Sequence, residues 1–347
     1  MATGQWPSIV DVASRMGADG KPLFVAEMLS QSNQVLEDIP WIAGNELASH
    51  TFVFRGSIPA GNWVGYNDGT PFGKSTTGKA AVDIATLVQW SQVDDNLARD
   101  SGDIDSFRQS EDIGIMEGLS QTWCEGLFYG NVVANRAQFM GLAPFYNTRN
   151  TASAANAANV IDGGGRGTSN TSIWAIGWKE GAIFGVFPRG WREGLQMEDQ
   201  GDVVPGFDSA GNPFKAWTTY FRWRGALVPQ DWRNAVRIAN LDTTAAGLAG
   251  PNAPDLFALM IESMRAFPAA GRAQSGITMT DAPRDASMGV RIVFYTNRTG
   301  GHYLDLQSVR DRNVLLRSTD YAGQPCTVFR DLPIKNVDQI LNTEATV

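Results

Sequence analysis

The chain has 347 residues, of which 43% are hydrophobic and 18% charged; this composition supports a sizeable buried core and excludes a disordered chain. Its net charge of −8 repels nucleic acid from most of the surface, although a small basic inner face remains compatible with it. Two distant thiols, Cys124 and Cys326, form neither a metal box nor a disulfide framework, and no apolar run approaches the ~20 residues of a membrane span.

The basic residues are mostly arginine, because only six of the 28 are lysine. Arginine suits desolvated protein–protein contacts, and a GC-rich genome explains the same bias equally well. The first 22 residues carry no basic region followed by an apolar core, so no signal peptide is visible. We therefore expect a soluble protein that is made in a reducing cytoplasm.

The N-terminal region, residues 1–45, is mixed in composition and predicts an arm. It contains one short apolar periodicity, Leu23–Leu36, that is compatible with a helix. Ile39-Pro40-Trp41 then interrupts this pattern, and the residue before a proline favours extended backbone.

An unusually long loop follows the arm. Two β-like runs, His50–Pro59 and Lys79–Trp90, flank the loop Ala60–Gly78, which has ~19 residues where hairpin loops usually have two to five. Turn-forming residues in it alternate with three aromatic residues: Trp63, Tyr66 and Phe72. Such an arm cannot bury its aromatic groups alone, so it needs a partner surface. This pattern indicates assembly rather than catalysis.

The strongest helix signal lies downstream, in Gly102–Asn131. Apolar residues recur there every three or four positions on one face, among them Met116, Leu119, Trp123 and Leu127. About 25 helical residues span roughly 37 Å. Glycines inside the helix each cost ~1 kcal/mol relative to alanine, so packing must stabilise it. Acidic residues before the helix, such as Asp103, offset its dipole and are a weaker match to a metal site.

The second half of the chain alternates strands, loops and helices, which makes the fold class mixed α+β. Polar residues between 148 and 170 predict a surface loop. The predicted elements are buried strands in Ser172–Phe187, a strand at Thr218–Leu227, a short helix at Pro229–Asn240, a helix at Asp255–Phe267, a strand at Arg291–Tyr295 ending in a turn at Asn297–Gly301, and closing segments at Val328–Phe329 and Leu332–Ile340.

No constellation of catalytic or ligand-binding residues is found in the sequence. Two histidines, His50 and His302, are few for general acid–base catalysis. Gly69–Ser75 resembles a phosphate-binding loop, but three residues separate its glycines where four are required, and no helix is predicted after it. We therefore expect no enzymatic activity, no metal and no cofactor. The eleven tryptophans leave open a glycan-binding or glycan-cleaving β-rich protein.

The order of these elements resembles the major capsid proteins of tailed bacteriophages, which have the HK97-type fold. Specific stretches are similar to a branch found in podoviruses and related phages, such as that of Bordetella. The similar stretches are Ser172–Trp178 followed by Phe187–Gly190, Thr219–Gly225 followed by Val236–Asn240, and Phe329–Ile334 with Ile340–Glu344. The resemblance spans nearly the whole chain and rests on the order of structural motifs.

The resemblance implies five regions: an N-terminal arm (1–47), an extended β-hairpin loop (48–92), a peripheral domain with a spine helix (93–147, 215–240 and part of the C-terminus), an axial domain (148–214 and 241–330) and a C-terminal strand or tail (331–347). The extended loop would lie over a neighbouring subunit. Its contacts would come from Trp63, Tyr66, Phe72, Lys74 and Lys79. The spine helix would pack through Met116, Leu119, Trp123 and Leu127.

The implied function is that of a shell protein in the virion. Hexamers and pentamers would form an icosahedral head around packaged double-stranded DNA, without sequence-specific binding, after assembly in the bacterial host cytoplasm. The implied partners are other copies of the chain, a portal, a decoration protein where one exists, and a separate scaffolding protein, because the chain has no long helical N-terminal extension. No membrane partner is implied.

Two further points follow from the resemblance. Some members cross-link their shells through a Lys–Asn isopeptide bond assisted by Glu; Lys74 and Lys79 could supply the donor, but no acceptor or assisting residue matches, so no cross-link is expected. An encapsulin-like shell that holds cargo has the same fold and stays open as an alternative.

Overall fold

The computed structural model describes residues 31–202, 204–208, 210–244, 248, 253–268, 290–310, 316–321, 324–330 and 332–347. Most of the expected N-terminal arm, most of the helix expected at Leu23–Leu36 and part of the expected axial domain lie outside these residues. The described chain contains helices and a mixed sheet, so the predicted α+β class is confirmed.

The helical elements, with η marking single 3-10 turns, are α2 (Val35–Asp38), α3 (Asp95–Asp100), α4 (Ile104–Tyr129), α5 (Leu142–Phe145), η1 (Ala155–Asn159), η2 (Trp232–Asn234), α7 (Leu256–Ala266) and α9 (Arg298–Arg310). The strands are β1 (Trp41–Ala43), β2 (Ser49–Ser57), β3 (Thr76–Asp83), β4 (Ala85–Asp94), β5 (Val160–Asp162), β6 (Asn170–Trp178), β7 (Ile183–Phe187), β8 (Leu195–Gly201), β9 (Gly206–Phe207), β10 (Pro213–Phe214), β11 (Ala216–Pro229), β12 (Ala235–Asp242), β13 (Arg291–Thr296), β14 (Leu316–Tyr321), β15 (Gln324–Phe329) and β16 (Leu332–Asn336).

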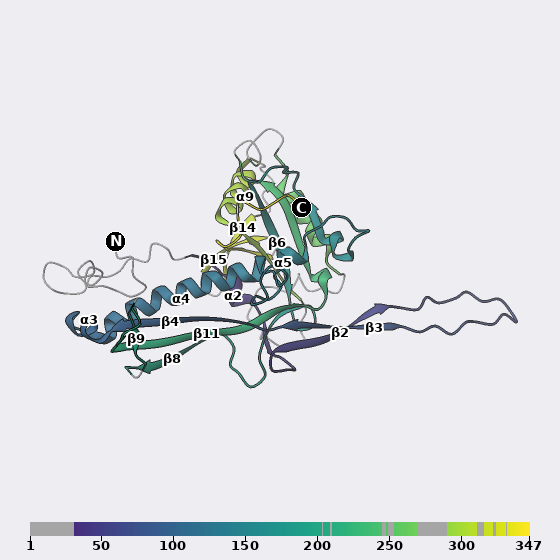
Figure 1. Ribbon diagram of the computed structural model, residues 1–347. Helices are drawn as coiled ribbons and strands as arrows, with labels where there is room; N and C mark the ends of the chain where they lie inside the picture. The colour runs from purple at the N-terminus through teal and green to yellow at the C-terminus, as the bar shows by residue number, and fades with distance from the viewer. Residues whose placement is uncertain are drawn as a thin grey trace.

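One half of the molecule is an elongated layer, in which β11 lies antiparallel to both β4 and β8 and α4 lies along one face (Figure 1). α4 begins after Asp103, whose carboxylate accepts hydrogen bonds from the N–H groups of Asp105 and Ser106. It ends at Gly130, where a Cβ would lie 2.4 Å from the carbonyl oxygen of Gly126. These ends lie within two residues of the predicted Gly102–Asn131.

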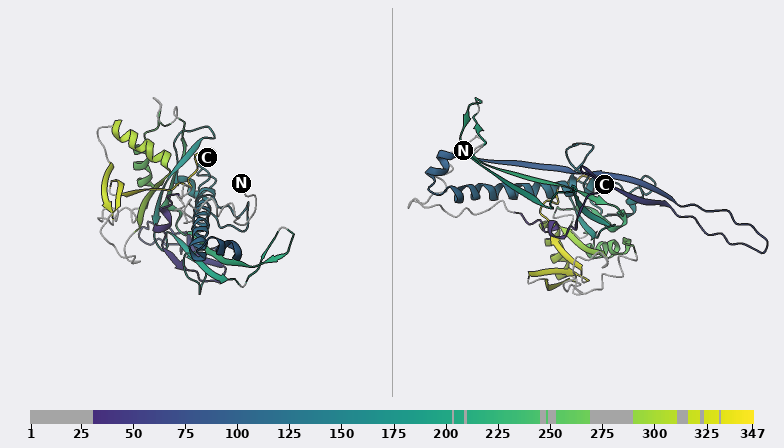
Figure 2. Two further views of the ribbon diagram at one scale, coloured as in Figure 1. Left: turned by 90° about the vertical axis from the view of Figure 1, so that its left-hand side faces the viewer. Right: turned by 90° about the horizontal axis from the view of Figure 1, so that it is seen from below.

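The other half is compact and is built around β6, which pairs with β12 and β13. Every residue of β6 is buried, because its alternating side chains serve two cores. Ile173 and Ala175 pack in one core with residues of α7 and α9. Trp174 and Ile176 pack in the other with residues of α4 and α5. Figure 2 shows the compact half at one side of the elongated layer.

The two halves meet at an aromatic cluster around Trp123 of α4. Its ring stacks on Trp223 of β11 with centroids 4.8 Å apart and planes 6° apart, and Trp41 of β1 lies 6.3 Å away. Gly185 and Gly225 leave room for these rings, because a Cβ at either position would approach the Trp41 ring to within 2.6 Å and 2.9 Å, respectively. The sequence therefore needs glycine on β7 and β11 where the indoles pass.

The short helix predicted at Pro229–Asn240 is wrong. Asp231 caps a single 3-10 turn, η2, and the chain then continues as β12, which pairs with β5 and β6. β12 is buried along nearly its whole length, and in the sequence a short segment buried on both faces does not distinguish strand from helix. Within residues 215–240, β11 pairs with β4, β8 and β7, whereas β12 pairs with β5 and β6.

The turn predicted at Asn297–Gly301 is also wrong, because these residues form the first turn of α9. The Asn297 side chain accepts a hydrogen bond from the N–H of Gly300 at 2.8 Å, as an N-cap residue does. Leu304 is buried in the core beside α7, and this packing outweighs the weak helix propensity of the two glycines.

The run Lys79–Trp90, predicted as one strand, is two strands that separate at Ile84. β3 pairs with β2 in a ladder of its own, whereas β4 pairs with β11. At the break, the N–H of Ile84 donates to the carbonyl of Ala48 at 2.9 Å, one step beyond the Ser49–Asp83 pair of the β2–β3 ladder. The two ladders are therefore separate units that share one chain segment.

Candidate inter-subunit interface

The hairpin β2–β3 and the loop beyond it form an arm that projects from the body (Figure 1). We use the word arm below for residues 49–83. One face of the hairpin is apolar, since Phe52 lies opposite Ala80 and Phe54 opposite Gly78. The Phe54 ring covers Gly78, where a Cβ would lie 2.5 Å from it. Phe52 packs against the core at the root, whereas Phe54 is 45% exposed, so this apolar face continues beyond the body.

The loop, residues 58–75, has no regular secondary structure and few internal hydrogen bonds. Trp63, Tyr66 and Phe72 are each fully exposed, with relative accessibilities above 100%. The tip is a turn around Asn67, at φ 70°, and the Asp68 carboxylate accepts only a long hydrogen bond of 3.3 Å from the N–H of Gly65. Within this described loop the aromatic rings contact neither one another nor the body.

The other predicted site residues lie in two regions, the arm and α4. Lys74 is exposed in the loop, and Lys79 is exposed on β3 opposite Val53. On α4, Leu119, Trp123 and Leu127 are buried and Met116 is half-buried. The arm residues and the α4 residues do not come together, because the first set faces solvent and the second faces the core.

His50 lies at the root of the arm and packs edge-on against the buried Phe184, with ring centroids 5.8 Å apart. Burial lowers the pKa of His50, and the nearby Glu46 carboxylate opposes this shift only in part. The imidazole is therefore a neutral packing group at neutral pH. Among the described residues no cluster of His, Cys, Asp and Glu could hold a metal ion. In the same part of the chain, none of the helices has the length and apolarity to cross a bilayer.

The face of the β4–β11–β8 layer that lies opposite α4 carries a second unusual group of residues. Strand alternation puts Trp217, Thr219, Phe221 and Trp223 toward the helix side and the residues between them on the other face. That other face presents Trp90 and Tyr220, whose rings lie 4.4 Å apart. Trp90 is 47% exposed, and its neighbour Val88 is 42% exposed, so this face is open to solvent.

Two arginines lie in the middle of this face beneath one indole ring. The turn 188–194 brings Trp191 back over β11, with left-handed glycines at Gly190 (φ 84°) and Gly194 (φ 83°). The guanidinium carbons of Arg222 and Arg224 lie 4.2 Å and 4.7 Å from the centroid of the Trp191 ring. These contacts are cation–π interactions. We call Trp90, Trp191, Tyr220, Arg222 and Arg224 the Arg–Trp surface.

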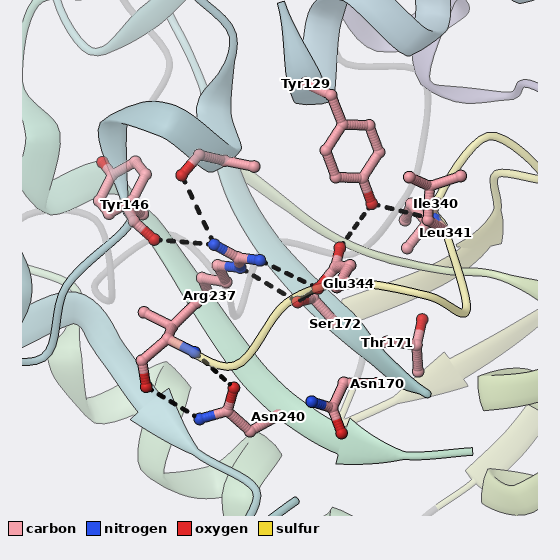
Figure 3. A network of polar contacts seen from close by, with 12 residues as sticks. Tyr129, Tyr146, Asn170, Thr171, Ser172, Arg237, Asn240, Ile340, Leu341 and Glu344 are labelled. Carbon is pink, nitrogen blue, oxygen red and sulfur yellow. Dashed lines mark hydrogen bonds and ion pairs between the residues drawn. The ribbon is translucent and has the colours of Figure 1, made fainter. Parts of the chain in front are cut away.

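Arg237 and Glu344 form a buried ion pair that joins β12 to the C-terminal segment (Figure 3). Their side chains are 4% and 3% exposed, and Arg237 Nη2 lies 2.9 Å from Glu344 Oε2. Arg237 also donates to Ser172 Oγ at 3.0 Å and to the carbonyl oxygen of Tyr146 at 2.9 Å. Ser172 in turn donates to the Glu344 carboxylate. The buried charges are therefore paired and hydrogen-bonded, as their desolvation requires.

The same network ties α4 to this segment (Figure 3). The Tyr129 hydroxyl donates to Glu344 Oε1 at 2.5 Å. Burial raises the pKa of Tyr129, and the Glu344 carboxylate raises it further, so the hydroxyl remains a donor. Asn240, in the left-handed region at φ 58°, accepts from the N–H of Val347 at 2.9 Å. The C-terminal segment thus fixes the end of α4 against β12.

A second buried network fixes the residues that lead into the arm. The Asp38 side chain, 1% exposed, lies 2.8 Å from Lys335 Nζ and 2.6 Å from Arg291 Nη2. It also accepts a hydrogen bond from the Tyr295 hydroxyl at 2.7 Å. Trp178 Nε1 donates to the same hydroxyl at 2.7 Å. α2 is therefore held against β13 and β16.

Sequence reasoning missed both buried networks and the Arg–Trp surface. Arg237 and Glu344 are 107 positions apart, and no local pattern relates them. For the Arg–Trp surface a partial signal existed, since basic and aromatic residues alternate in Thr218–Leu227, but Trp191 comes from a separate turn.

Comparisons with known proteins give one family model and several similar structures. A family model described as "Major capsid protein GP7" matches residues 17–347. Among solved structures, a chain in the cryo-EM structure of bacteriophage Epsilon15 is 27% identical, with 100% of this chain and 99% of that chain covered and a TM-score of 0.75. A chain of the bacteriophage JBD30 capsid is 12% identical, with 91% and 95% covered and a TM-score of 0.43. A search of curated proteins found no match.

Proposed function

Because the chain belongs to the major capsid protein GP7 family, we propose that many copies of it close into a shell in which each arm lies over a neighbouring copy. The chain is a capsid protein of a tailed phage with the HK97-type fold, as its sequence resemblance predicted. The proposal that goes beyond the family concerns the contact between copies, which we assign to the arm. Nothing found favours the encapsulin-like or the glycan-binding alternative.

The exposed arm is the observation that carries this proposal. Trp63, Tyr66 and Phe72 are fully exposed in the isolated subunit, and large aromatic groups are costly to leave in water. An aromatic side chain buries about 150–250 Å² when it is covered, so three of them provide roughly 450–750 Å². That area approaches the ~800 Å² per partner of a standard protein–protein interface. One arm therefore supplies most of one side of an interface.

The wider proposals follow from the family. We propose hexamers and pentamers around packaged double-stranded DNA, with a separate scaffolding protein and a portal as partners and assembly in the host cytoplasm. The protein's role would be structural, with no catalytic step. The elongated half would be the peripheral domain, and the compact half, including β12, the axial domain.

The experiment is a deletion that removes the loop but keeps both strands. Residues Ile58–Ser75 are replaced by a two-residue Asn-Gly turn, which suits the pairing of Ser57 with Thr76. We expect soluble, folded subunits and no closed particles, by size-exclusion chromatography and negative-stain microscopy. A variant with Trp63→Ser, Tyr66→Ser and Phe72→Ser keeps the length of the loop and should fail in the same way. Normal particles from the deletion variant would refute the proposal.

A further inference from the structure

We propose that the Arg–Trp surface of one copy is the docking site for the arm tip of a second copy, with Asp68 pairing with Arg222 and Arg224 and Tyr66 packing beside Trp90. This inference rests on the proposed function and deepens it, because it names the surface that receives the arm. Four properties of the described residues lead to it: unpaired charge, complementary chemistry, position and reach.

The two arginines have no acidic partner of their own. Within the described residues, no carboxylate lies within ion-pairing distance of Arg222 or Arg224. Arg224 Nε donates to Thr86 Oγ1 at 3.2 Å, whereas Arg222 Nε is buried without a hydrogen-bond acceptor. Glu198, opposite Tyr220, lies on the same face but forms no ion pair with either arginine, so positive charge exceeds negative charge around the two guanidinium groups. The surface therefore fits an acidic group flanked by apolar rings.

The arm tip presents this combination of groups. Asp68 is the only acidic residue in the loop 58–75, and it is exposed beside the fully exposed Tyr66. A carboxylate can bind the fork of an arginine with two hydrogen bonds, and an aromatic ring can pack on neighbouring rings. The charges and the aromatic groups of the tip thus complement those of the surface.

The position of the surface excludes docking within one chain. Arg224 lies opposite Thr86, two residues beyond the break at Ile84, so the surface is at the root of its own arm. From Ser49 to Asn67 an extended chain spans at most about 60 Å, and the β2–β3 ladder holds its first part straight. The tip of the arm therefore lies far from the Arg–Trp surface of the same copy, which is at the root of that arm (Figure 1). Because two different patches meet, the contact is heterologous and places successive copies head to tail.

The first experiment locates the tip directly in assembled particles. Tyr66 is replaced by the photoreactive residue p-benzoylphenylalanine, and particles are assembled from a mixture of isotopically light and heavy chains. After irradiation, mass spectrometry should identify cross-links between light and heavy chains at 86–92, 188–194 or 218–224. Cross-links to any other segment, to the same chain or to nucleic acid would overturn the inference. The proposed function would survive these results, because it fails only if the loop-deleted chain still forms closed particles.

The second experiment tests the charge pairing. Asp68→Arg and Arg224→Asp should each raise the chain concentration needed for particle formation by about tenfold or more, because each places like charges together. Combined in one chain, they should restore that concentration to within about threefold of the unaltered chain. Glu180→Arg and Arg136→Asp reverse exposed charges outside the arm and outside the Arg–Trp surface, and they serve as matched controls. Equal effects of the test and control variants, or no recovery in the combined variant, would count against the pairing.

Discussion

Glu344→Gln is expected to destabilise the unassembled subunit far more than a conservative change normally does. The amide keeps the shape of the carboxylate and can still accept from Tyr129, but it removes the negative charge 2.9 Å from Arg237 Nη2. Both side chains are at most 4% exposed, so water cannot solvate the Arg237 guanidinium once the carboxylate is gone. Removing one partner of a buried ion pair typically costs about 3–5 kcal/mol. For Glu344→Gln we expect the free energy of unfolding to fall by about 3 kcal/mol, the lower end of this range, because Arg237 keeps Ser172 and the Tyr146 carbonyl as acceptors.

The assay is urea unfolding of the subunit, followed by tryptophan fluorescence, with the midpoint shift read at constant m-value. Arg298→Gln is the matched control, because it removes an ion pair with Asp338 in which the arginine is 71% exposed. That variant should lose no more than about 1 kcal/mol. The combined variant Arg237→Met with Glu344→Gln should recover part of the loss, since no unpaired charge remains. A loss from Glu344→Gln equal to that of the control would refute the reasoning.

Three other predictions concern the body of the subunit. Gly114→Ala and Gly118→Ala in α4 should each stabilise the subunit by about 0.5–1 kcal/mol in urea unfolding, because nothing lies within 4 Å of the added Cβ. A loss of particles without a loss of stability would show that another copy packs against this side of α4. The free energy of unfolding should fall as the pH rises above about 10, the ordinary tyrosine pKa. Burial raises the pKa of Tyr146 and of Tyr295 in the folded chain, so above that pH their phenols ionise more readily in the unfolded chain. A urea midpoint that stays the same from about pH 9 to about pH 11.5 would contradict this. Cys124 should resist thiol reagents until the subunit unfolds, because burial raises its thiol pKa. Rapid labelling of Cys124 in the folded subunit, detected by mass spectrometry, would contradict its burial.

The arm and α4 could be predicted from the sequence because each has a strong local signal. The loop could be predicted because the segment between the two expected strands is longer than a hairpin turn and contains three aromatic residues. α4 was visible because apolar residues recur every three or four positions on one face. In both cases the local pattern was enough to predict the element, although packing must still stabilise the helix.

The misread elements are those that distant contacts decide. α9 begins at Arg298-Thr-Gly-Gly, which locally indicates a turn, and the burial of Leu304 against the neighbouring core makes it a helix. The break at Ile84 was invisible because strand propensity is the same on both sides of it, whereas the pairing partners differ. The Arg–Trp surface needed Trp191 to fold back over β11, which no pattern in either segment predicts.

The break at Ile84 also means that side-chain packing at the root, and not a shared β-ladder, joins the arm to the body. The last residue of β3 pairs with β2 and the first residue of β4 pairs with β11, so no ladder runs across the joint. A change in the angle of the arm would therefore disturb the packing of Phe52 and His50 against the body and leave the β4–β11 hydrogen bonds intact. If the tip docks as we propose, neighbouring copies could tilt against each other by different amounts while each tip kept the same contact. In the proposed shell, such a joint would let one subunit fit both flat and sharply curved regions.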